Sequence, residues 1–164
     1  MANCLYCGRP AGFLRKKHRE CEAKHNEAWS CMLALATDSA LGKAPLDTLE
    51  GRLKEVAKSG FVPISRVRKA LIRGWEQAVE HFLEDGHLNE AEEERLNQFR
   101  IRFSLSQDDL DERGAYSRLV KGAVLREIMN GVVPERVQVR GNLPFNFQKT
   151  EKLVWLFPET RYYE

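Results

Sequence analysis

The spacing of apolar residues along the chain predicts a succession of helices. Residues 18–36 contain no glycine or proline, and residues 46–58 repeat apolar side chains at intervals of three and four. A third segment opens at Pro63, because the missing amide hydrogen of proline is tolerated in the first turn of a helix. It has a long apolar stripe, which predicts the central core helix: Ile64, Val67, Leu71, Trp75, Val79 and Phe82.

Capping patterns predict three further helices. An Asn-x-x-Glu capping box opens a helix over residues 89–103, and a Ser-x-x-Asp pattern opens a short helix around Leu110. A last helix over residues 115–129 ends at an Asn-Gly pair. The side chains that we expect to face the core in these segments are Leu96, Phe99, Ile101, Phe103, Leu119, Val120, Val124, Leu125 and Ile128.

The pattern changes after Pro134. Residues 136–140 alternate with a period of two, and residues 152–157 form a β-favouring apolar run that ends at Pro158. Residues 161–163 could supply a partner strand. We therefore expect a small C-terminal antiparallel hairpin that packs on the helices, because two strands alone are only marginally stable.

Cysteine and histidine spacing near the N-terminus predicts a metal site. A Cys4-x-x-Cys7 turn followed by Gly8 places two sulfurs beside one ion, and His18 and Cys21, at i and i+3, project from one face of the next helix. This set is typical of a zinc knuckle with Cys4, Cys7, His18 and Cys21 as ligands. Because four protein ligands leave no open position, we expect the zinc to be structural.

Several alternatives to this ligand set stay open. His25 lies one turn beyond Cys21 and could replace His18 as a ligand. Cys4 and Cys7 could instead form a redox dithiol or a disulfide. Cys31 lies in an apolar run, and we expect it to be a small buried core residue outside the site.

Together these elements predict a mainly α protein of class α+β. We expect a zinc knuckle over residues 1–26, a bundle of four to six helices over residues 27–133, and a small β segment over residues 134–164 that packs on the helices. The chain opens without an apolar leader and has no apolar stretch of bilayer length. A cytoplasmic protein is therefore expected, in a reducing setting where thiols are free to bind metal.

Charge is balanced overall but uneven in distribution. The chain has 26 Lys and Arg residues against 24 Asp and Glu residues. A basic group surrounds the proposed metal and is a candidate contact for nucleic acid or another partner: Arg9, Arg15, Lys16, Lys17 and Arg19. A second group follows Pro63, namely Arg66, Arg68, Lys69 and Arg73. Such runs are most often solvated faces.

No catalytic motif occurs in the chain. The four histidines belong to no HExxH, GxSxG or phosphate-loop pattern. His81, Glu84 and His87 could form an acid/base or metal cluster, but we expect exposed side chains at a helix end. We expect no calcium binding around Gly86, because His81 and Leu83 would occupy loop positions that need oxygen ligands. Residue spacing therefore identifies no nucleophile or general base, and a non-enzymatic role is the simpler expectation, with an enzyme as an open alternative.

The order of the CxxCG…HxxC knuckle, the EDGHLNEAEEERLNQF turn and the LPFNFQKTEKLVWLF segment resembles bacterial or phage proteins of poorly assigned function. In some of these proteins a zinc-ribbon head and a helical middle precede a small β-rich, pleckstrin-like module. The resemblance implies an adaptor or a sensor and implies no catalytic residue.

Three classes of function follow. The first is a non-enzymatic, zinc-stabilised interaction or adaptor protein whose knuckle and helices bind another macromolecule, most simply a protein. The second is nucleic-acid binding through the basic knuckle, with Tyr6 and Phe13 available to stack on bases. The third is an enzyme whose site is assembled from scattered acidic residues.

Overall fold

The computed structural model describes residues 2–12, 15–84 and 88–131. Six helices account for most of this part of the chain, which confirms the mainly helical prediction: α1 (Arg19–Ala40), α2 (Leu49–Ser59), α3 (Arg66–Phe82), α4 (Glu90–Arg102), α5 (Gln107–Asp111) and α6 (Ala115–Met129). In the described ranges the β pairing is an isolated antiparallel bridge between Asn3 and Pro10. The predicted C-terminal hairpin, over residues 136–163, lies outside the described residues.

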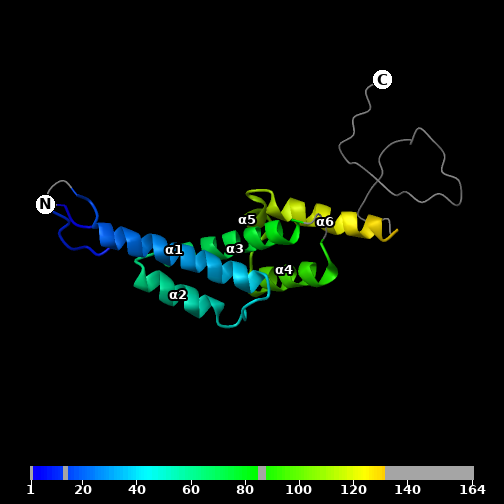
Figure 1. The fold of residues 1–164 in the computed structure, drawn as a ribbon, viewed down its shortest axis with the longest axis horizontal. Coiled ribbons are helices and arrows are strands. Elements are labelled where there is room, and N and C mark those ends of the chain that lie inside the picture. The colour runs from blue at the N-terminus through cyan, green and yellow to red at the C-terminus, as the bar shows by residue number, and fades with distance from the viewer. Residues whose placement is uncertain (1, 13–14, 85–87, 132–164) are drawn as a thin grey trace, which may run out of the picture.

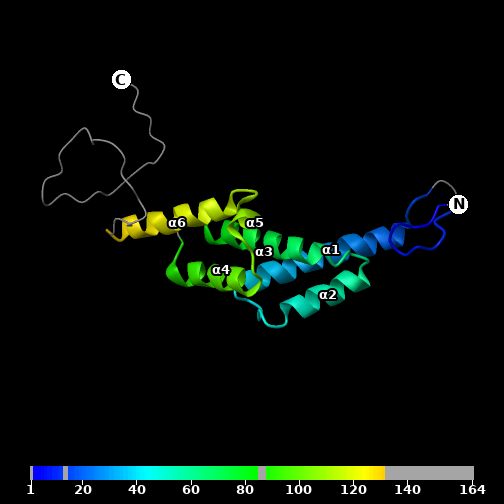
Figure 2. The same cartoon turned by 180° about the vertical axis from the view of Figure 1, so that it is seen from behind.

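The helices form an elongated body with the N-terminal knuckle at one end and α6 toward the other (Figure 1). Helix α2 returns along α1, so that α3 starts near the N-terminal half of α1 and runs beside it in the same direction (Figure 2). Helices α4 and α6 pack on the C-terminal part of α3. The predicted central position of α3 is therefore confirmed.

Trp75 lies at the centre of the core. Its side chain is fully buried, and its indole Nε1 donates a hydrogen bond of 3.0 Å to the backbone carbonyl of Leu96 in α4. On another side its ring stacks against Tyr116 of α6, with ring centroids 6.4 Å apart. One tryptophan thus joins α3 to α4 and α6, because its ring fills the space between these helices and its only donor is satisfied.

Helices α1 and α3 approach closely at Gly74. A Cβ atom at this position would lie 2.4 Å from the Cβ of Ala36 and within 2.8 Å of the backbone of α1. Such distances are far below van der Waals contact. The residue in α3 opposite Ala36 must therefore lack a side chain if the two backbones are to pack at this distance.

Gly74→Ala should destabilise the protein, although alanine favours helices. We expect the free energy of unfolding to fall by about 1–3 kcal/mol, because the added methyl forces α1 and α3 apart. Gly51 lies in an exposed turn of α2, where an added Cβ atom would meet no neighbouring atom within 4 Å. Gly51→Ala should therefore raise that free energy by about 0.5–1 kcal/mol. Urea unfolding followed by circular dichroism measures both. Equal effects at the two positions would contradict the close helix contact.

Both predicted capping boxes are confirmed. The side chain of Asn89 accepts a hydrogen bond from the amide of Glu92, and the Glu92 carboxylate accepts one from the amide of Asn89. Ser106 and Asp109 make the same exchange at the start of α5. Arg68 of α3 also donates to the Asp109 carboxylate at 2.7 Å, and the pair anchors this short helix on α3.

Some predictions of buried side chains are wrong. Ile64 precedes α3 rather than lying in it, and its side chain is half exposed. Ile101 and Leu125 are exposed as well, although Phe99 and Ala123 are buried. Residues two apart point to opposite sides of a helix, so each of these exposed side chains faces away from the buried stripe.

Cys31 is also exposed, which contradicts its predicted place in the core. The buried side of α1 is the stripe of Ala28, Met32, Ala36 and Ala40, at intervals of four. Cys31 lies beside this stripe rather than on it. The apolar run in the sequence is therefore wider than the face that α2 and α3 cover.

None of the six described helices combines the length and the apolar character that a bilayer crossing requires.

Candidate metal centre

A tight backbone turn presents Cys4 and Cys7 on the same side. The amide of Gly8 donates to the carbonyl of Cys4 at 2.9 Å, and the amide of Cys4 donates to the carbonyl of Arg9 at 2.7 Å. Gly8 has a φ angle of +71°, in the left-handed region that glycine adopts without strain. This confirms the role predicted for Gly8, because the chain reverses there and leaves both sulfurs pointing inward.

The start of α1 supplies the other two candidate ligands. His18 is the N-cap residue of α1 in an extended conformation, and Cys21 lies in the first turn. The amide of His18 also lies 3.4 Å from the sulfur of Cys4 and donates a hydrogen bond to it. The helix start is thus joined to the knuckle turn directly through a candidate ligand.

Cys4, Cys7, His18 and Cys21 form the metal-ligand cluster. The four ligand atoms all lie within 4.8 Å of one another, and this cluster could bind a metal ion. His18 Nδ1 is 3.4 Å from the sulfur of Cys7 and 3.7 Å from that of Cys21. The sequence-predicted ligands are therefore brought together by the fold.

The ring of His18 is oriented from behind by a backbone group. Its Nε2 lies 2.9 Å from the carbonyl oxygen of Pro10, so that Nε2–H donates and Nδ1 is left to face the sulfurs. Carbonyls that hold a ligating histidine in this way set its tautomer and ring orientation. Sequence reasoning missed the role of Pro10, because a backbone carbonyl leaves no residue-type signal.

The electrostatics of the cluster favour a cation. Burial raises the pKa of the Cys4 thiol, but hydrogen bonds with the backbone of Cys7, His18 and Tyr6 outweigh burial and lower that pKa to about 6. At Cys21, burial together with the hydrogen bond and negative charge of Cys7 raises the pKa to about 11. With its pKa raised this far, the Cys21 thiol keeps its proton at neutral pH unless a positive charge lies beside its sulfur.

His25, the alternative histidine ligand, lies outside the cluster. Its Nδ1 is 3.3 Å from the carbonyl oxygen of Phe61, at the start of the turn before α3. Its ring also packs on Tyr6, with ring centroids 4.8 Å apart. His25 therefore links the knuckle to the helical body, and the fold brings His18 to the sulfurs instead.

The basic residues predicted around the metal are at the surface. Arg9, Arg15, Lys16, Lys17 and Arg19 are all exposed. Lys17 forms an ion pair with Glu22 in the first turn of α1. The ring of Tyr6 contacts His25 and is only partly exposed, whereas Phe13 lies outside the described residues.

The candidate acid/base cluster at the end of α3 is an exposed pair. His81 Nδ1 lies 3.6 Å from a carboxylate oxygen of Glu84, and the two side chains are 52% and 73% exposed. This agrees with the expectation of exposed side chains at a helix end. His87, the third member, lies outside the described residues.

No protein-family model, curated protein or solved structure matches this chain. The function must therefore be argued from the geometry of the chain itself.

Proposed function

We propose that the metal-ligand cluster holds a structural zinc ion and that this chain is a non-enzymatic interaction protein that binds another protein. The observation that carries the proposal is the convergence of three cysteine sulfurs and one imidazole nitrogen within 4.8 Å. Three sulfurs and one nitrogen are the donor set of a common class of structural zinc site.

The ligand spacing supports zinc. Zn–S bonds of about 2.3 Å and Zn–N bonds of about 2.0–2.1 Å in a tetrahedron place sulfur and nitrogen about 3.6 Å apart. The two distances from His18 Nδ1 to sulfur, 3.4 and 3.7 Å, bracket this value. With four protein ligands around the ion, no coordination position is left for water or substrate, so the metal would stabilise the fold rather than react.

The role as an interaction protein rests on the surroundings of the site. The ion would tie the knuckle turn to the first turn of α1, and the Tyr6–His25 contact continues the connection toward Phe61. The ion would thus fix the knuckle at the end of the helical body where Figure 1 shows it. The resemblance to bacterial or phage proteins with a zinc-ribbon head adds to this proposal, because it implies an adaptor or a sensor.

Metal analysis and co-purification test the two halves of the proposal separately. Mass spectrometry of the metal content of the purified protein should give one zinc ion per chain. An affinity-tagged chain, purified from cells that express it natively, should retain a protein in fixed ratio after nuclease treatment. Zinc without any retained protein would overturn the interaction role alone. A protein purified without metal, with its knuckle still folded, would overturn the metal centre.

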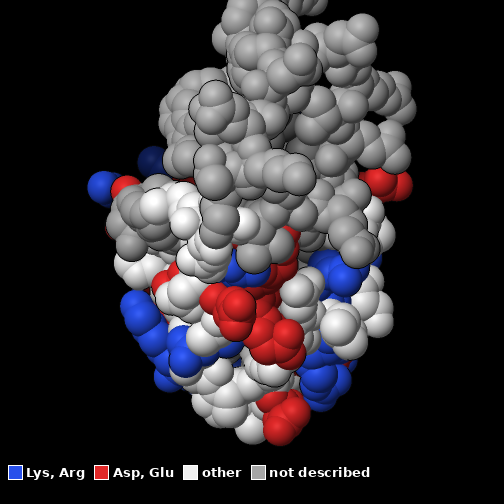
Figure 3. Space-filling view, turned by 90° about the vertical axis from the view of Figure 1, so that its right-hand side faces the viewer, with Lys and Arg blue, Asp and Glu red and all other residues white. Residues whose placement is uncertain are grey.

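A second candidate function is nucleic-acid binding through the exposed basic residues of the knuckle. This end of the chain carries five predicted contact cations, and one of them, Lys17, is already paired with Glu22. The end view toward α4 and α6 shows basic and acidic side chains intermixed (Figure 3). A nucleic acid would therefore bind at the knuckle end rather than there.

The salt dependence of binding decides the second candidate. Fluorescence anisotropy with single-stranded RNA and DNA at two salt concentrations should show affinity that falls steeply as salt rises, because phosphate contacts release counterions. The quadruple variant Arg9→Ser, Arg15→Ser, Lys16→Ser and Arg19→Ser should lose that affinity. An absence of binding at low salt would rule this function out.

A further inference from the structure

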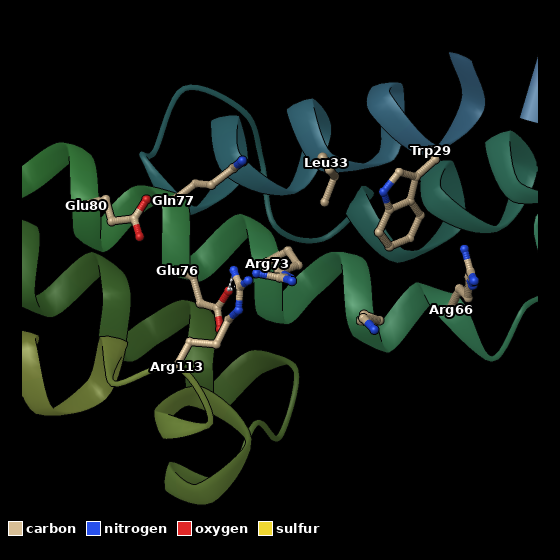
Figure 4. A pocket seen from close by; sticks show the side chains of 9 residues that line it. Trp29, Leu33, Arg66, Arg73, Glu76, Gln77, Glu80 and Arg113 are labelled. Carbon is tan, nitrogen blue, oxygen red and sulfur yellow. Dashed lines mark hydrogen bonds and ion pairs between the residues drawn. The ribbon is translucent and has the colours of Figure 1, made fainter. Parts of the chain in front are cut away.

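A groove of about 410 Å³ lies along one side of α1 and α3, and none of the four metal-ligand candidates lines it. Helix α1 contributes Trp29 and Leu33, and α3 contributes a polar face that includes Arg66, Lys69 and Glu76 (Figure 4). Arg113, in the turn between α5 and α6, reaches the same groove. The lining therefore comes from three separate parts of the chain.

One end of the groove is internally neutralised. Glu76 is only 4% exposed, and its carboxylate lies 3.1 Å from Arg73 and 4.0 Å from Arg113. Burial raises the pKa of Glu76, and the charge of Arg73 opposes that shift. Glu80, which follows one turn later, is paired with Arg118 at 3.3 Å. Both carboxylates at this end are thus paired with arginine side chains of the same chain.

The other end carries cations without such partners. Arg66 and Lys69 are exposed on the first turns of α3, and in the described part of the chain no carboxylate lies within ion-pair distance of either. The guanidinium of Arg66 lies over the ring of Trp29, 5.7 Å from its centroid. Two unpaired positive charges are therefore placed beside an aromatic surface and the adjacent Leu33.

We propose that this groove binds an acidic peptide segment of the partner protein. Carboxylates of the peptide would pair with Arg66 and Lys69, since a guanidinium presents a planar fork of donors that fits a carboxylate. Apolar side chains of the same segment would lie on Trp29 and Leu33. The inference rests on the proposed function, because it identifies the surface and the chemistry by which a protein would be bound.

The charge pattern favours a peptide over a nucleic acid. The groove has four cationic side chains against two carboxylates, and both carboxylates lie toward one end. A phosphate backbone that followed the groove would meet Glu76 and Glu80 after the first contacts. The groove also offers a single aromatic ring, that of Trp29, whereas single-stranded nucleic acids stack successive bases on several rings.

The test measures binding of a fluorescein-labelled peptide of Glu, Leu and Ser residues by anisotropy, with a second peptide in which Gln replaces each Glu. The wild-type chain should bind the Glu peptide and not the Gln peptide. The variant Arg66→Glu/Lys69→Glu should weaken binding at least about tenfold, because it reverses both charges that the carboxylates contact. Circular dichroism melting of this variant should match the wild type, since both side chains are exposed.

The matched control is Arg52→Glu/Lys58→Glu, which makes the same change of net charge on exposed positions of α2 outside the groove. It should bind the Glu peptide as the wild type does. Equal loss in both variants, or no binding by the wild type, would overturn the inference. Tighter binding of a single-stranded oligouridylate that is lost in Arg66→Glu/Lys69→Glu would also overturn it, in favour of nucleic acid.

Co-purification separates failure of this inference from failure of the proposed function. A protein that the wild type and Arg66→Glu/Lys69→Glu retain equally would leave the interaction role intact and exclude this groove as the contact. Loss of the same protein only in the groove variant would support the inference.

Discussion

Replacing Cys7 with serine should remove the metal from the protein and unfold the knuckle while the helical body stays intact. The sulfur of Cys7 lies 3.4 Å from His18 Nδ1, so its loss removes one of four ligands from the cluster. The binding free energy of a structural zinc ion is of order 10 kcal/mol, and in a segment this short it is also the free energy of folding. Metal content should fall from one ion per chain to none.

Nuclear magnetic resonance distinguishes the two parts of the molecule in this variant. Amide resonances of residues 2–12 and 15–21 should collapse to disordered positions, and those of α2 to α6 should stay in place. Cys31→Ser is the control, because Cys31 is an exposed thiol outside the cluster, and it should keep the full metal content. Retention of stoichiometric metal by Cys7→Ser would refute the proposed ligand set.

Replacing Trp75 with alanine should bring the helical body close to unfolding. Trp75 is fully buried, and truncation of a buried tryptophan costs about 3–5 kcal/mol in lost burial and in the cavity left behind. Natural domains have only about 5–15 kcal/mol of stability in total. Urea unfolding followed by circular dichroism, rather than by tryptophan fluorescence, measures the change without depending on the residue that is replaced.

Two further substitutions separate the contribution of the Trp75 hydrogen bond from that of ring burial and provide an exposed control. Trp75→Phe keeps an aromatic ring but loses the hydrogen bond to the carbonyl of Leu96, so it should cost less than alanine. Ile101→Ala removes apolar atoms from an exposed position of α4 and should change stability by less than about 0.5 kcal/mol. A cost at Ile101 similar to that at Trp75 would contradict the assignment of α4's buried face.

The metal-ligand cluster illustrates how far local spacing carries a prediction. A Cys-x-x-Cys turn and a His-x-x-Cys helix start are short enough for the covalent chain itself to bring each pair together. The choice between His18 and His25 was different, because both lie on the same helix. It depends on which backbone carbonyl contacts each ring: that of Pro10 contacts His18, and that of Phe61 contacts His25.

The helices were predictable for a similar reason. Apolar periodicity and capping boxes act within a few residues, and the boxes at Asn89 and Ser106 form as expected. Errors arose where burial depends on a neighbouring helix, as at Ile101 and Cys31. Periodicity marks a face of a helix, but the width of the covered part is set by whatever packs on it.

The α1–α3 groove is likewise a feature that depends on how distant segments pack. The basic residues that follow Pro63 were visible along the chain, and a solvated face was the simplest expectation for them. Only the fold places Trp29 beneath Arg66 and brings Arg113 to the buried carboxylate of Glu76.

The sequence by itself determined the presence and order of the six helices, two capping boxes and the three cysteine ligand candidates, because each depends on interactions between residues close along the chain. The tertiary structure decided which histidine faces the sulfurs, which apolar side chains are covered, and where unpaired cations meet an aromatic ring. These outcomes depend on contacts between residues that lie far apart in sequence, and no local pattern records which segments will become neighbours.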